Sequence, residues 1–64
     1  MSAADPDRDI REAARGRDRQ ELRYLARYER YEMETYLRHW GRSELSPSER
    51  ELAEEIARQE GLNV

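Results

Sequence analysis

The sequence predicts an all-α fold, a helical hairpin with a long first helix over about 10–40 and a short second helix over 47–60. Apolar residues recur three and four positions apart from Leu22 to Trp40, which is the spacing of an amphipathic helix. The run Ser-Pro-Ser-Glu at 46–49 is typical of a helix start, with a capping serine, a proline in the first turn and a glutamate that completes a capping box. No segment shows the pattern of a strand.

The first helix is preceded by residues 1–9, which we expect to be a flexible start. From Ile10 to Gln20 the sequence permits a helix, but Gly16 weakens it by roughly 1 kcal/mol relative to alanine. Two interpretations stay open, one continuous helix over 10–40 or a separate segment joined near Gly16. We prefer the first, because residues 10, 13 and 14 fall on the side of the later tyrosines. Gly41 is suited to end this helix, and residues 41–46 are the expected loop before the second helix of a single 10–64 domain.

Wound as one helix, residues 22–40 have an apolar face and a separate tyrosine face. The second helix is short and adds only two large apolar residues, so it would cover about half of the first. With 36% hydrophobic residues, 42% charged residues and no cysteine, the chain has little else to build a core from. We therefore expect a second copy or a partner to complete a helical bundle. The expected interface consists of Leu22, Leu25, Met33, Tyr36, Leu37, Trp40, Leu52 and Ile56 on the apolar side and Tyr24, Tyr28 and Tyr31 on the tyrosine side.

Two surfaces to cover predict a small protein–protein interaction module that associates with itself or serves as a subunit or adaptor of a larger protein assembly. No nucleophile motif and no glycine-rich phosphate loop occur in the sequence. We therefore expect neither an enzyme nor a bound cofactor. The sequence has no secretory signal pattern and no membrane-spanning apolar run, so a cytoplasmic protein without membrane contact is expected.

A second hypothesis is a small nucleic-acid-binding regulator in which Arg23, Arg27 and Arg30 contact phosphates beside the tyrosines. The net charge of −3 argues against it. Residues 45–62, LSPSERELAEEIARQEGL, resemble the opening helix of helix-turn-helix DNA-binding domains of the LuxR or sigma-factor type. That resemblance implies a helix in this segment. We expect no DNA reading from it, because two residues follow where a recognition helix would be needed.

A third hypothesis is a carboxylate-rich metal site formed by oligomerisation, with Glu29, Glu32 and His39 as ligands. Within one straight helix Glu32 and His39 are about 10 Å apart along the axis, so other copies would have to supply ligands. Glu29 falls inside the apolar face. Whether it is paired, solvated or a ligand stays open at this point.

Overall fold

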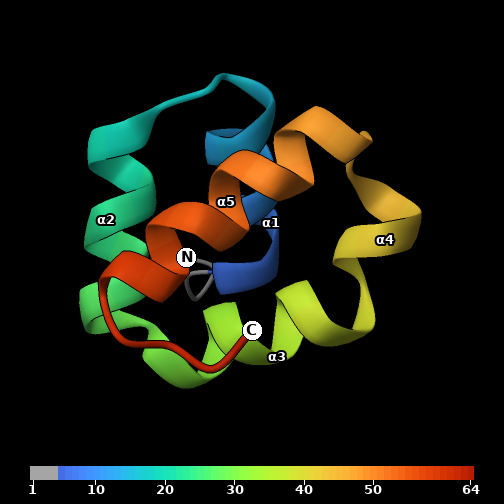
Figure 1. Cartoon of the computed structure of the whole chain (residues 1–64). Coiled ribbons are helices and arrows are strands. Elements are labelled where there is room, and N and C mark those ends of the chain that lie inside the picture. Colours follow the sequence, from blue (N-terminus) through green and yellow to red (C-terminus); the bar gives the residue numbers. More distant parts are fainter. Residues whose placement is uncertain (1–4) are drawn as a thin grey trace.

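The computed structural model describes residues 5–64, and these fold into five helices without a strand. The helices are α1 (Pro6–Arg15), α2 (Arg19–Tyr28), α3 (Arg30–His39), α4 (Gly41–Glu44) and α5 (Pro47–Gln59). In Figure 1, α1 and α5 cross in the middle, α2 and α4 stand on either side, and α3 closes the bottom. The all-α class is confirmed. The long first helix is wrong, because residues 10–40 contain three helices with abrupt turns between them.

The first turn follows Gly16 and matches the interpretation that we did not prefer. Arg17 has φ 53°, the left-handed conformation that ends many helices. Its amide donates to the carbonyl of Ala14 at 3.1 Å, and the next amide, of Asp18, donates to the carbonyl of Ala13 at 2.9 Å. This pair of hydrogen bonds is a Schellman motif. Asp18 then caps α2 with its side chain, so the chain stops one helix and starts another within three residues.

The second turn lies at Glu29, with φ −124° and ψ 50°, where neither glycine nor proline stands. In a straight helix Glu29 would sit in the middle of the apolar face, between Leu25 and Met33. The break leaves Glu29 partly exposed while Leu25 and Met33 are both buried. Because an unpaired carboxylate is costly to bury, the position that interrupts the apolar face is also a favourable place for the helix to bend.

Two other boundaries differ from the expected ones, whereas α5 begins at Pro47 as expected. Residues 1–4 of the expected flexible start lie outside the described residues, and Pro6–Asp9 belong to α1, which Asp5 caps through its side chain. Gly41 begins the short helix α4 inside the expected 41–46 loop. In α5 both capping-box hydrogen bonds are present: Ser46 Oγ accepts from the Glu49 amide at 3.2 Å, and Glu49 Oε1 accepts from the Ser46 amide at 3.0 Å.

The hydrophobic core lies where α1, α2, α3 and α5 meet. All of its members are less than a tenth exposed, and they are Ile10, Ala13, Ala14, Leu22, Leu25, Ala26, Met33, Tyr36, Leu37, Leu45, Leu52, Ala53, Ile56, Ala57 and Leu62. The prediction that the three residues of α1 lie on the tyrosine side is wrong, because α1 turns back and packs against α2 and α3. The apolar face is therefore covered within one chain, and the reason for expecting a second copy to cover it does not hold.

Among residues 5–64, no helix combines the length and the apolar character that a membrane span requires.

Candidate functional site

The expected tyrosine face is exposed. Tyr24 is 54% exposed, Tyr28 68% and Tyr31 73%, and these three residues are called the tyrosine surface below. The rings of Tyr24 and Tyr28 lie 4.9 Å apart and are tilted by 42°, within the range in which aromatic rings attract each other. The described part of the chain leaves most of each ring open to solvent.

The helix geometry explains why these rings point outward. Tyr24 and Tyr28 stand one turn apart on α2 and are exposed, whereas Leu22 and Leu25 of the same helix enter the core. Tyr31 follows in the first turn of α3, beyond the break at Glu29. The tyrosine surface therefore continues from one helix to the next around a bend.

Arginines next to the tyrosine surface hold the end of α5. Arg27 Nε donates to Glu60 Oε1 at 2.9 Å, and Arg30 Nη1 donates to the Glu60 carbonyl at 3.0 Å. The Arg27 hydrogen bond lowers the pKa of the Glu60 carboxyl, and the charges of Arg27, Arg23 and Arg30 lower it further. Two of the three arginines proposed for phosphate contact are thus hydrogen-bonded to Glu60, and the charge of the third, Arg23, also acts on its carboxylate.

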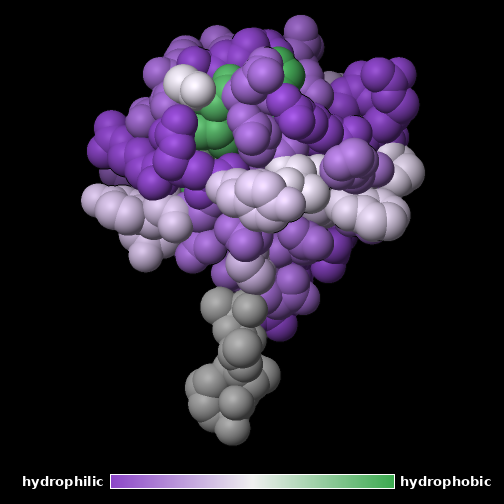
Figure 2. Space-filling model, turned by 90° about the horizontal axis from the view of Figure 1, so that it is seen from below, coloured by the Kyte–Doolittle hydropathy of each residue, from purple (hydrophilic) through white to green (hydrophobic). Residues whose placement is uncertain are grey.

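Trp40 is not part of the core, contrary to the sequence-based expectation. It is 50% exposed at the junction of α3 and α4, because α3 ends at His39 and the chain turns before the indole can join the apolar face. Figure 2, which looks at the molecule from below, shows a mainly hydrophilic face crossed by pale surface of intermediate hydropathy.

Trp40 lines a groove between α1, α3 and α4 together with Asp7, Arg11, Tyr36 and Glu44. In its floor the buried hydroxyl of Tyr36 donates to Glu44 Oε1 at 2.9 Å, and Arg11 Nη1 donates to the same oxygen at 3.1 Å. Burial raises the pKa of Tyr36 to about 12, with the hydrogen bond to Glu44 as the second cause. No local pattern in the sequence indicates this network, since Arg11 and Glu44 are 33 residues apart.

The proposed metal ligands lie at different points of the fold. Glu29 lies at the α2–α3 junction, Glu32 in the first turn of α3 and His39 in its last turn. Residues 5–64 bring no three histidine, cysteine, aspartate or glutamate side chains into an arrangement that could hold a metal ion.

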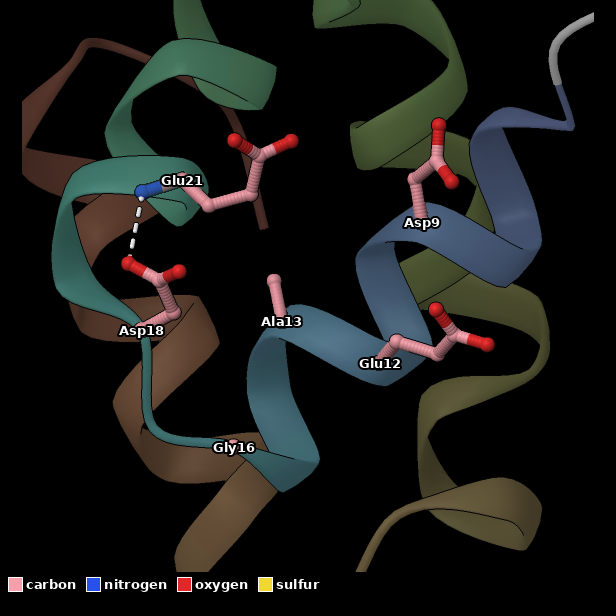
Figure 3. Close-up of a pocket in the computed structure, with 6 residues that line it drawn as sticks. All are labelled: Asp9, Glu12, Ala13, Gly16, Asp18 and Glu21. Carbon is pink, nitrogen blue, oxygen red and sulfur yellow. Dashed lines mark hydrogen bonds between the residues drawn. The ribbon is translucent and has the colours of Figure 1, made fainter.

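An acidic groove separates α1 from α2 (Figure 3). Asp9 and Glu12 come from α1, and Asp18 and Glu21 from the start of α2. Figure 3 shows that the carboxylates do not converge, because Glu12 points away from α2 and Asp18 turns back to accept a hydrogen bond from the Glu21 amide. The groove thus combines a helix cap with solvent-facing acids.

Comparison of the chain with protein-family models, curated proteins and solved structures finds no match. The proposals below therefore depend on residues and geometry alone.

Proposed function

We propose that this protein is a small non-enzymatic protein-binding module whose contact surface is Tyr24, Tyr28 and Tyr31. The supporting observation is the exposure of all three rings, each more than half open to solvent, in a chain that buries its aliphatic core residues almost completely. Exposed aromatic side chains that lie close together are characteristic of interaction sites. We further expect the protein to act in the cytoplasm.

Tyrosine suits this role because it combines a large apolar ring with a hydroxyl that can hydrogen-bond at the edge of a contact. Both α2 tyrosines lie on a regular helix, so their backbone is fixed before a partner arrives. Little conformational entropy is then lost when they are covered, which favours binding. Arg23 is next to Tyr24 on the same helix and adds positive charge at the rim.

Self-association and binding to a different protein both remain compatible with this proposal, but the structure changes what self-association would require. The apolar residues of α2 and α3 are already covered by α1 and α5. A second copy would therefore have to dock on the tyrosine surface alone, and a monomer would fold without it.

The nucleic-acid hypothesis has less support. Arg27 and Arg30 are already hydrogen-bonded to Glu60, and the net charge of −3 opposes a polyanion. It is retained as one outcome of the experiment.

The test compares the wild-type chain with the triple variant Tyr24→Ser, Tyr28→Ser, Tyr31→Ser. The matched control is Glu51→Ser with Glu55→Ser, two exposed residues on α5. Each chain is produced in its source organism, and the mass of the native assembly is measured after gentle purification. We expect the wild type and the control to share an assembly mass, either a multiple of 7.7 kDa or that of a mixed complex, and the triple variant to run as a monomer.

Two results would overturn the proposal. One is an unchanged assembly mass in the triple variant. The other is salt-sensitive retention of nucleic acid by the wild type, which would favour the second hypothesis. Circular dichroism at 222 nm establishes that the triple variant remains folded, as expected for substitutions of exposed residues.

A further inference from the structure

The groove between α1, α3 and α4 has a different chemistry from the tyrosine surface. Its lining includes the half-exposed Trp40 and the exposed Asp7. Tyr36 and Arg11 line it as well, and both donate hydrogen bonds to Glu44 Oε1. The positive charge of Arg11 thus compensates the negative charge of Glu44. Within the described residues, the Asp7 side chain takes part in neither a hydrogen bond nor an ion pair.

Negative charge dominates around Asp7. Burial raises the pKa of the Asp7 carboxyl, and the charges of Asp5, Glu44 and Glu32 raise it further, while Arg11 alone lowers it. Burial, the largest cause, attracts no cation, but the negative charges of Asp5, Glu44 and Glu32 create a potential that also attracts another cation placed beside Asp7. The indole face of Trp40 attracts cations as well, through the quadrupole of its ring.

We propose that this groove binds one arginine or lysine side chain of a partner protein, with its charged group at the Asp7 carboxylate and its aliphatic stem against Trp40. Long cationic side chains match such a site because they combine an apolar stem with a charged end. This site is separate from the tyrosine surface, so it adds a second point of contact and does not depend on the function proposed above.

Trp40 is the single tryptophan of the chain, so its fluorescence reports directly on the groove. The probes are the blocked peptide acetyl-Gly-Arg-Gly-amide and the same peptide with citrulline, which keeps the shape of arginine but has no charge. We expect the arginine peptide to change the Trp40 emission in a saturable way at millimolar concentration, and the citrulline peptide to bind at least threefold more weakly, since an exposed charge pair contributes modestly.

Two variants of α1 separate a local contact from a general effect of net charge. Asp7→Asn and Glu12→Gln each remove one negative charge from exposed positions of the same helix, but Glu12 lines the acidic groove on the other side of α1. We expect Asp7→Asn to weaken binding of the arginine peptide about threefold or more and Glu12→Gln to leave it unchanged. Trp40→Leu, followed through line broadening of the peptide's NMR signals, should weaken binding also.

Equal binding of the arginine and citrulline peptides would overturn the proposal. Equal weakening by Asp7→Asn and Glu12→Gln would do so too, because the effect would then come from overall charge. A linear, unsaturated response up to roughly 10 mM peptide would show that the groove has no such site.

Discussion

The hydroxyl of Tyr36 should make the protein sensitive to alkaline pH in a way that one substitution removes. Tyr36 is 1% exposed, and its hydroxyl donates a hydrogen bond to Glu44. Ionisation would bury a phenolate against a carboxylate and break this hydrogen bond. The pKa of Tyr36 is therefore raised from 10.0 to about 12 in the folded protein, so folding favours the neutral hydroxyl.

The size of the effect follows from that difference. The stabilisation is complete below pH 10, where Tyr36 is neutral in both states, and it is lost as the pH rises towards 12. At about 1.36 kcal/mol for each pH unit, the loss amounts to about 2.7 kcal/mol, or about 100-fold in the folding equilibrium. For a domain of this size that is a large share of the total stability.

The measurement is urea unfolding by circular dichroism at pH 8, 10 and 12, for the wild type and Tyr36→Phe. We expect the variant to be about 1–2 kcal/mol less stable at pH 8, through the lost hydrogen bond. Above pH 10 its free energy of unfolding should fall less steeply than that of the wild type. Tyrosinate absorbance should show one of the four tyrosines ionising late. Parallel loss of stability in both proteins, or a single ionisation step for all tyrosines, would refute the reasoning.

Four other perturbations test the fold by the same urea measurement. Gly61 has φ +90° and ends α5 in a Schellman motif, in which its amide donates to the Arg58 carbonyl at 3.0 Å and the Leu62 amide to the Ala57 carbonyl at 2.9 Å. Gly61→Ala should therefore cost about 1–2 kcal/mol, and an unchanged stability would contradict this motif. Arg17 holds φ 53°, so Arg17→Gly should stabilise by about 0.5–1 kcal/mol, with Ser48→Ala as the control for the hydrogen bond that Arg17 makes to Ser48. Met33 is fully buried, so Met33→Ala should cost about 2–5 kcal/mol, and a smaller loss would mean that the core collapses around the gap. The pKa of Glu60 is lowered in the folded state, so its contribution is present above pH 4.5 and lost in more acidic solution; Glu60→Gln should make stability less dependent on pH in that range.

The sequence predicted which residues are buried better than it predicted the path of the chain. Of the apolar residues expected on the first helix, all but Trp40 lie in the core, because helical spacing identifies the apolar side of each turn whatever the helix does later. The capping box at Ser46 was equally clear, since its hydrogen bonds are local. Both predictions depend on residues within one or two turns of each other.

The helix breaks at Arg17 and Glu29 depend on contacts between residues that are distant in the sequence, and local sequence patterns do not indicate such contacts. Arginine at the left-handed position of a Schellman motif carries no sequence signature, because glycine is the residue expected there. Glu29 is a good helix former in isolation. The helix bends at this position because a straight rod would leave its apolar face open, whereas a bent one covers it with α1 and α5. The network of Arg11, Tyr36 and Glu44 could not be predicted from the sequence for the same reason.

The helix breaks at residues 16–18 and at Glu29 change the expected role of the tyrosine surface in folding, but not its exposure. In a straight helix or a bent one, Tyr24 and Tyr28 form a stripe separate from Leu22 and Leu25, and this stripe is exposed in the structure. In the straight model a partner was needed to complete the fold, and losing the tyrosines would have cost stability as well as binding. With the core complete in one chain, the tyrosines become separable from folding, and their replacement should abolish association while the free energy of unfolding changes by less than about 0.5 kcal/mol. A triple variant that loses both together would indicate that the tyrosines stabilise the fold, and the case for a dedicated contact surface would fail.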